Sequence, residues 1–199
     1  MAHKRLGIDI DGVLANFVDP FCDFYARTVG RDLFPPRPYE PPCWEFPRHC
    51  GYTLDEDRKA WTAVAADEYF WERLLMYPSA GWPYQRLMEW SILGAHDVYF
   101  MTNRKGLHVK QQTERWLRCR YNGRAVPTVL ITDNKPYAAI ALHLDALIDD
   151  YHQNTQEMAL AVPTCHTYLL NRSWNAQEHA GIDVVRVDTL EEMFRREAL

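Results

Sequence analysis

Short runs of apolar and β-branched residues recur along the chain, separated by segments with helical periodicity. Each run has the length of one strand, and the runs cover residues 5–10, 97–102, 128–132, 146–150, 165–170 and 182–187. Strands that alternate with helices are typical of a parallel sheet covered by helices on its faces. The pattern therefore predicts an α/β domain built on a parallel sheet.

A long insertion separates the first two predicted strands. It spans about ninety residues, far more than an ordinary crossover connection, so we expect it to hold a subdomain. Residues 34–47 carry six of the twelve prolines, which favours a loop over a helix there. The pattern of residues 54–76 predicts one or two helices that begin after Thr53, since Glu56 three positions later completes a capping box.

Tryptophans gather in the same region. Five of the seven lie at positions 44, 61, 71, 82 and 90. Large aromatic side chains at these positions are expected to pack the subdomain against the core. Alternatively, one or two of them line a pocket in which a flat ring stacks.

Charge and cysteine content narrow the class of protein. The net charge of −5 argues against a generally basic nucleic-acid binder. The five cysteines are odd in number and scattered, which fits reduced thiols better than paired bridges. Neither a secretory leader nor an apolar stretch of membrane-spanning length is visible, so we expect a cytoplasmic protein without a membrane partner.

One segment departs from the acidic balance. Residues 104–124 contain seven Lys or Arg and a single acid, Glu114. Val109, Thr113 and Trp116 recur at helical spacing, which predicts an amphipathic helix with its basic residues in solvent. The same residues are also compatible with a rim that attracts phosphate-bearing substrates.

Two carboxylates follow the first predicted strand. Asp9 and Asp11 lie two positions apart in the apolar stretch 6–17, so they begin on the same side of a strand and repel one another. A turn at Asp11-Gly12 would explain Asp11 and leaves Asp9 unexplained.

Further polar residues end the next predicted strands. The ends of parallel strands meet at one edge of the sheet, where we expect a set formed by Asp9, Asp11, Thr102, Asn103, Lys135, Asp149 and Asp150. Gathered carboxylates need a counter-ion, and hard oxygen ligands favour Mg²⁺, which commonly shares its shell with a substrate phosphate. We therefore predict a magnesium site used in phosphate chemistry.

Each of these residue types suits one role in phosphoryl transfer. Asp9 at the strand end is the candidate nucleophile, and Asp11 is the candidate general acid and base. Thr102, Asn103 and Lys135 are expected to hold the phosphoryl oxygens. Alternatively, Lys135 is an exposed lysine in the first turn of a helix, and Lys105 or Lys110 holds the phosphoryl oxygens in its place.

The stretches 9–17, 100–104, 131–136 and 146–154 resemble the four ordered motifs of the haloacid dehalogenase (HAD) superfamily. Within it they are most similar to the 5′(3′)-deoxyribonucleotidase family, as is the segment 169–175. The resemblance implies a Rossmann-like core at residues 1–16 and 81–199, with a small helical cap inserted at residues 17–80.

The resemblance also implies roles for particular residues. Asp9 and Asp11, the latter through its carbonyl, would bind Mg²⁺ together with Asp149 and Asp150. Phe17 and Trp44 would contact the base of the substrate. Thr102, Asn103, Arg104 and Lys135 would bind its phosphate, and Arg104 can form a two-pronged pair with a second phosphate or with a carboxylate.

The leading hypothesis is a Mg²⁺-dependent phosphomonoesterase that hydrolyses (deoxy)nucleoside monophosphates through an aspartyl-phosphate. One alternative places the phosphate at the 3′ end of a polynucleotide held by residues 104–124. Another is a non-catalytic nucleotide-binding module with the same fold. The expected partner is a small-molecule phosphate monoester. The sequence leaves open whether the protein also binds a nucleic acid and whether it forms a homodimer.

Overall fold

The computed structural model describes residues 2–121, 123 and 126–199. Its main sheet is formed by β1 (Arg5–Asp9), β4 (Asp97–Thr102), β5 (Thr128–Ile131), β6 (Ala146–Asp149), β7 (His166–Leu170) and β8 (Val184–Val187). The strand order is β5-β4-β1-β6-β7-β8, and every neighbouring pair is parallel. The predicted α/β fold with a parallel sheet is confirmed.

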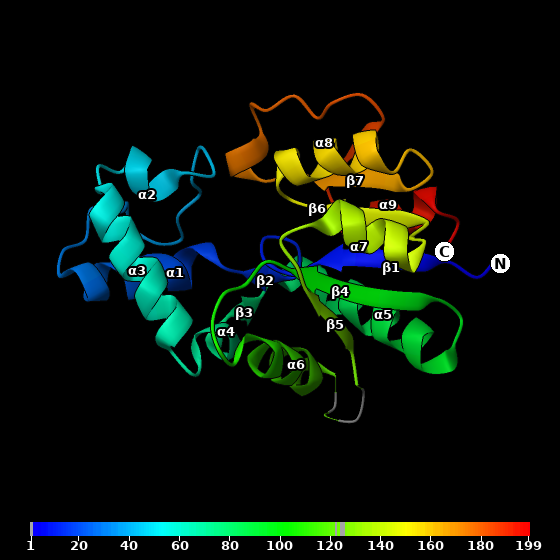
Figure 1. Cartoon of the computed structure of the whole chain (residues 1–199), viewed down its shortest axis with the longest axis horizontal. Coiled ribbons are helices and arrows are strands. Elements are labelled where there is room, and N and C mark those ends of the chain that lie inside the picture. Colours follow the sequence, from blue (N-terminus) through cyan, green and yellow to red (C-terminus); the bar gives the residue numbers. More distant parts are fainter. Residues whose placement is uncertain (1, 122, 124–125) are drawn as a thin grey trace.

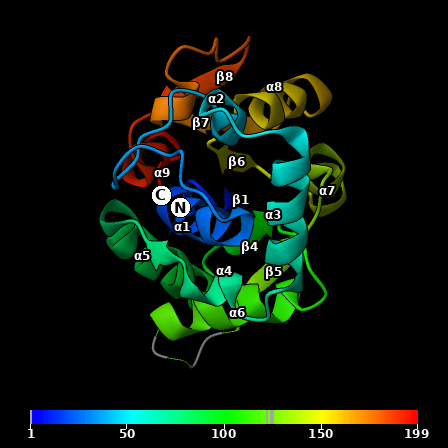
Figure 2. The same cartoon turned by 90° about the vertical axis from the view of Figure 1, so that its left-hand side faces the viewer.

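Helices cover both faces of this sheet (Figures 1 and 2). They are α5 (Gly81–Leu93), α6 (Val109–Arg120), α7 (Lys135–Leu142), α8 (His152–Ala161) and α9 (Leu190–Arg196). A large apolar cluster includes buried residues of α5, α6 and α9, such as Leu87, Trp116 and Phe194. A smaller cluster, with Ala139 and Met158, lies beneath α7 and α8. Two apolar layers therefore hold the sheet between them.

The direction in which the chain adds strands reverses next to β1. After β1 the chain adds β4 and β5 on one side, and it then crosses to place β6, β7 and β8 on the other. In open parallel sheets this reversal opens a crevice at the carboxyl ends of the central strands, where ligands bind. The fold thus places the ends of β1, β4 and β6 together.

The insertion between β1 and β4 is mostly helical. It contains α1 (Val18–Val29), α2 (Phe46–His49), α3 (Leu54–Ala66), α4 (Phe70–Arg73) and a 3₁₀ turn (Pro78–Ala80). Its ends meet in a short antiparallel ribbon of β2 (Ala15–Asn16) and β3 (Leu75–Met76). Figure 1 shows α1, α2 and α3 beyond the carboxyl ends of the strands, on the side opposite to both termini. The division at residues 17–80 into a separate cap stays a prediction.

Local signals account for several of these elements. The Thr53 hydroxyl accepts a hydrogen bond from the Glu56 amide and the Glu56 side chain accepts one from the Thr53 amide, so the predicted capping box opens α3. Residues 34–45 form bends and turns, as the prolines predict, and α2 begins only at Phe46. The predicted strand 182–187 is shorter than expected, because β8 begins at Val184.

The predicted amphipathic helix is α6, whose Val109, Thr113 and Trp116 are buried. Arg124, at the end of the predicted basic segment, lies outside the described residues. All five cysteines are free thiols. Among residues 2–121, 123 and 126–199, no helix has both the length and the apolar character that a membrane crossing requires.

Candidate active site

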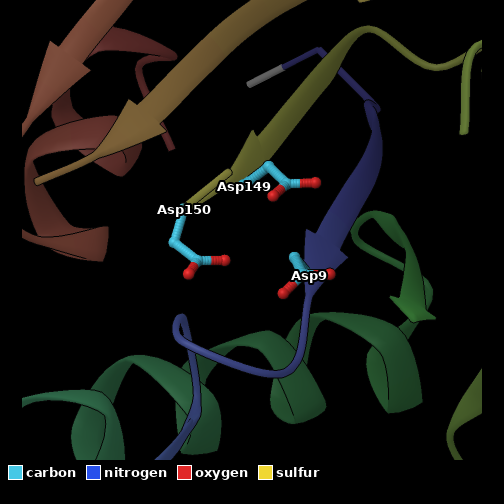
Figure 3. A group of neighbouring side chains, drawn as sticks. All are labelled: Asp9, Asp149 and Asp150. Carbon is cyan, nitrogen blue, oxygen red and sulfur yellow. The ribbon is translucent and has the colours of Figure 1, made fainter. Parts of the chain in front are cut away.

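Three buried carboxylates gather at the carboxyl ends of the central strands. Asp9 is the last residue of β1, Asp149 is the last residue of β6, and Asp150 follows it. One oxygen from each lies within 4.8 Å of the others, and Figure 3 shows the three side chains at the ends of the two strands. The convergence expected for these carboxylates is therefore present in the structure.

Lys135 supplies positive charge to this group. It is the first residue of α7, only 5% exposed, and its ammonium forms ion pairs with Asp9 and Asp149. Burial alone would lower the pKa of Lys135, but the Asp149 and Asp9 carboxylates outweigh it and raise that pKa. The nearby Asp133 is exposed, so Lys135 is the residue that this loop brings to the site.

One lysine does not balance three buried carboxylates. Burial raises the pKa of Asp9 well above its usual value, and the Asp149 and Asp150 carboxylates act in the same direction against Lys135. Burial and the Asp149 carboxylate raise the pKa of Asp150 to about 8. Without a further cation, the site therefore tends to retain protons near neutral pH.

The donor set fits Mg²⁺. It consists of carboxylate oxygens from Asp9, Asp149 and Asp150, close enough to share one ion, and hard oxygen donors suit this cation. An excess of buried negative charge is the electrostatic condition that a divalent cation relieves. The carbonyl of Asp11 was predicted as a further ligand, and this remains a prediction.

Neighbouring residues orient these carboxylates. The Tyr151 amide donates to Asp149 Oδ1 over 2.8 Å and the Asn154 side-chain amide donates to Asp149 Oδ2 over 3.0 Å. The Trp174 indole donates to Asp150 Oδ2 over 2.8 Å. Such contacts fix the direction in which each ligand oxygen points. The segment 169–175, noted in the sequence for its resemblance, thus contributes Trp174 to the site.

The loop after β1 passes close to Asp150. Gly12 has a φ of +81°, and a Cβ at this position would lie 2.0 Å from Asp150 Oδ2. The Gly12 carbonyl accepts a hydrogen bond of 2.6 Å from Arg172 Nε. Only glycine combines this backbone conformation with such a close approach.

Asp11 and Asp9 pair with different cations. Its carboxylate accepts two hydrogen bonds from Arg104, each of 2.8 Å, and one of 3.1 Å from the Thr102 hydroxyl. Of the two pairings considered for Arg104, the structure contains the one with a carboxylate. The basic residues of 104–124 are thus not all in solvent, because Arg104 is buried.

The carboxylates and their neighbours line a cavity of about 440 Å³, here called the acidic cavity. Its remaining polar lining comes from Thr102, Asn103, Arg104, Lys105, Lys135 and Asn154. Lys105 donates to the Asn103 side chain over 2.7 Å, which places a second ammonium at the rim. Lys110 instead pairs with Glu114.

A second cavity of about 340 Å³, here called the aromatic cavity, adjoins the first. Both are lined by Asp11, Phe17, Trp44, Trp61 and Asp150. Phe17 stacks on Trp61 with ring centroids 5.8 Å apart, and Trp44 stacks on Tyr151 at 4.7 Å. Flat apolar walls of this kind suit a planar ring.

The tryptophans divide between packing and cavity lining. Trp90 is buried, Trp44 and Trp61 line both cavities, and Trp82 is 62% exposed. Trp71 does both, because it is buried and also lines the acidic cavity. Sequence reasoning allowed one or two pocket tryptophans and did not single out Trp61. The available signal for Trp61 was a flat aromatic side chain within the predicted helical insertion.

Sequence reasoning assigned no role to Tyr151, Asn154, Arg172 or Trp174. Tyr151 and Asn154 lie within the stretch 146–154 and Arg172 and Trp174 within 169–175, both of which carry the resemblance. Position in these stretches was the available signal. Their partners could not be read from it, because Arg172 contacts a carbonyl 160 positions away.

Solved structures of similar fold were found. A structure described as a haloacid dehalogenase-like hydrolase from Burkholderia xenovorans superposes with a TM-score of 0.58 at 14% identity, covering 99% of this chain and 98% of that one. A structure described as a phosphoglycolate phosphatase from Lactobacillus plantarum gives a TM-score of 0.57 at 14% identity, covering 98% of this chain and 99% of that one. The HAD-hydrolase YfnB from Bacillus subtilis, bound to magnesium, gives 0.57 at 13%, covering all of both chains.

The chain therefore has the fold of HAD-type hydrolases, with an aspartate cluster at the ends of its central strands. No family model matches the sequence, and no curated protein sequence matches it. The finer likeness to deoxyribonucleotidases rests on the sequence motifs alone.

Proposed function

We propose that this protein is a Mg²⁺-dependent phosphomonoesterase that hydrolyses (deoxy)nucleoside monophosphates through an aspartyl-phosphate on Asp9. The observation that carries the proposal is the junction of the two cavities. Carboxylates and Lys135 lie in one, and the aromatic walls of Phe17, Trp44 and Trp61 begin at its edge. A phosphate in the acidic cavity would thus leave an attached base against the aromatic rings.

In the proposed reaction, an Asp9 oxygen attacks phosphorus while the bond to the leaving oxygen breaks, and Asp11 gives that oxygen its proton. The alcohol departs and Asp9 carries the phosphoryl group. Asp11 then takes a proton from a water that attacks the same phosphorus, which releases phosphate and restores Asp9. Bound Mg²⁺, held by Asp9, Asp149 and Asp150, would supply charge neutralisation for the phosphoryl oxygens.

Lys135, Thr102, Asn103 and Arg104 were predicted to hold the phosphoryl group. Lys135 and Asn103 line the acidic cavity. The Lys135 ammonium pairs with Asp9 and Asp149 and keeps a third N–H, which can donate to an anion, as can the Asn103 amide. Thr102 and Arg104 line it too, but both donate to Asp11. We assign phosphate binding to Lys135 and Asn103, with Lys105 as a further cation at the rim.

The neighbours support the reaction class in this proposal. One of them is described as a phosphatase and another contains magnesium. We also assign residues 17–80 to a cap, since they supply Phe17, Trp44 and Trp61 to the aromatic cavity. A cytoplasmic location and a homodimer stay predictions.

The polynucleotide alternative has less support in the structure. It needs free positive charge along 104–124, yet Lys110 pairs with Glu114 and Arg115 pairs with Glu72. Binding of a polynucleotide would weaken steeply as salt rises, whereas mononucleotide turnover would change little. Salt dependence therefore separates the two substrates.

The test measures release of inorganic phosphate with Mg²⁺ from 5′- and 3′-(deoxy)nucleotides, sugar phosphates and 3′-phosphorylated oligonucleotides. Asp9→Asn should abolish release, while Asp55→Asn, at an exposed position of α3, should retain it. Equal rates for wild type and Asp9→Asn would overturn the nucleophile. Absence of release from every substrate would favour the non-catalytic module.

The base-binding part has its own test. Trp44→Ala should raise KM for nucleotides by about 5-fold or more, because stacking on a base is worth about 1–3 kcal/mol. Trp82→Ala, an exposed position that lines neither cavity, is the matched control. An unchanged KM in Trp44→Ala would remove this residue from the base site.

A further inference from the structure

Arg104 forms a buried ion pair with Asp11. Its side chain has no exposed surface. Nε donates to Asp11 Oδ2 and Nη2 donates to Asp11 Oδ1, both over 2.8 Å. Nη1 donates to the Thr113 hydroxyl over 3.1 Å. The edge of the guanidinium that would grip a phosphate in two-pronged fashion is therefore occupied by Asp11.

Two indole rings hold the guanidinium from its sides. The Arg104 Cζ lies 4.9 Å from the ring centroid of Trp71 and 5.6 Å from that of Trp116. Each ring is fixed in turn, since the Trp71 indole donates to the Lys105 carbonyl and the Trp116 indole donates to the Leu74 carbonyl. A planar cation held in this way has one orientation to offer its partner.

The two oxygens of Asp11 are left unequal. Oδ2 accepts from Arg104 and from the Thr102 hydroxyl, while Oδ1 accepts from Arg104 alone among the described residues. Oδ1 thus keeps a lone pair for a substrate or a water. The Asp11 side chain remains 18% exposed and lines both cavities.

We infer that Arg104 is a positioning residue for proton transfer, which fixes Asp11 so that Oδ1 meets the leaving oxygen of the phosphate ester. The inference rests on the proposed function and replaces phosphate binding as the role of Arg104. A preorganised carboxylate needs no rotation at the moment when the leaving oxygen takes its proton. Lysine would keep the charge and lose the fork.

Leaving groups of different quality isolate this role. An alkyl leaving group, such as the 5′ oxygen of a nucleotide, needs the proton from Asp11, whereas p-nitrophenolate departs without it. kcat/KM reports the first phosphoryl transfer and excludes the later hydrolysis of the aspartyl-phosphate. Damage to Asp9, to metal binding or to the fold would lower kcat/KM for both substrates alike.

The experiment compares kcat/KM for a nucleoside monophosphate and for p-nitrophenyl phosphate in wild type, Arg104→Lys and Asp11→Asn. Since a general acid is worth about 10²–10⁴ in rate, we expect Arg104→Lys to lose about 10–100-fold with the nucleotide and less than about 3-fold with the aryl ester. In the Asp11→Asn background, Arg104→Lys should add little further loss. Arg115→Lys, on the exposed face of α6, is the matched control and should match wild type.

Equal losses on both substrates would overturn the positioning role, and so would full additivity with Asp11→Asn. If lysine prevents folding, as judged by near-UV circular dichroism, Thr113→Val is measured instead. It removes the acceptor of Nη1 and should lower the ratio of nucleotide to aryl turnover by about twofold or more; an unchanged ratio would overturn the inference. A wild type active on neither substrate would defeat the proposed function and this inference with it, whereas an active wild type with unchanged ratios defeats only this inference.

Discussion

Replacing Lys135 by methionine tests the electrostatic balance of the carboxylate site. Lys135 is buried and pairs with both Asp9 and Asp149. Methionine fills similar space without charge, so the substitution removes the positive charge that these carboxylates contact and leaves the packing largely intact. The carboxylates then remain buried without this partner.

The expected cost is large for a chain of this size. Removing one partner of a buried ion pair costs about 3–5 kcal/mol, against a total free energy of unfolding of about 5–15 kcal/mol. At about 2–4 °C per kcal/mol for a protein of this length, the Tm should fall by about 6–20 °C. The loss should be smaller at pH 5 than at pH 8, because Asp150, whose pKa is raised to about 8, is protonated at the lower pH. The raised pKa of Asp9 acts in the same direction.

The assay is thermal unfolding followed by circular dichroism at pH 8, in EDTA and again with saturating Mg²⁺. If the carboxylates bind Mg²⁺, the ion at one hundred times its Kd should raise the free energy of unfolding by about 2.7 kcal/mol. Lys59→Met, at an exposed position of α3, controls for loss of a lysine. A Lys135→Met protein that unfolds within about one degree of wild type in EDTA would refute the reasoning.

Three further outcomes are expected. In EDTA, the free energy of unfolding of wild type should fall as pH rises from about 4 to about 8, by at most about 1.4 kcal/mol per pH unit for each group. The cause is the raised pKa of Asp9 and of Asp150, which makes the folded state bind more protons than the unfolded one. Denaturant titrations at pH 5 and pH 8 check this, and a flat profile would contradict it. Trp61→Ala should raise KM for nucleotides about 5-fold or more through lost stacking, with Trp82→Ala unchanged, and equal KM values would count against the aromatic cavity. Gly12→Ala should lower both Tm and kcat, since its Cβ would lie 2.0 Å from Asp150 Oδ2; wild-type phosphate release by this variant would show that the loop can move.

Most of the sheet could be predicted because its inner strands, β1, β4, β6 and β7, are largely buried on both faces. A strand of this kind is a continuous apolar run bounded by polar residues, as at residues 97–102 and 146–149, and such a run is visible without knowledge of its neighbours. Strand ends are less certain, since the last residues pair weakly and their polarity follows the site. β8 begins at Val184, two residues later than predicted, because Asp183 has a φ of +63°, which lies outside the extended conformation of a strand.

The insertion was harder to predict. Its existence followed from length alone, whereas α1 (Val18–Val29) was not anticipated. Its N-cap, Phe17, makes no side-chain hydrogen bond to the helix, so the usual polar start signal is missing. Phe17 instead stacks on Phe21 and Trp61. The helix did leave a pattern that the sequence analysis did not use, since Val18, Phe21, Cys22 and Tyr25 are buried at helical spacing and Gly30 ends the helix.

The burial of Arg104 was also beyond the sequence. A charged residue in a loop is expected in solvent unless a partner compensates its desolvation. Here the partners are Asp11, 93 positions earlier, and two indoles from different elements. Only the fold brings these together, so a helical pattern that begins at Val109 carries no trace of them.

The two carboxylates that repel one another in the sequence are separated in the structure by their cations. Asp9 faces Lys135 at the start of α7, and Asp11 faces Arg104 after β4. Each cation comes from its own segment, so the proposed nucleophile and the proposed proton-transfer group are held independently. We therefore expect loss of Lys135 to damage the reaction with every leaving group, whereas loss of Arg104 damages it selectively where a proton must reach the departing oxygen.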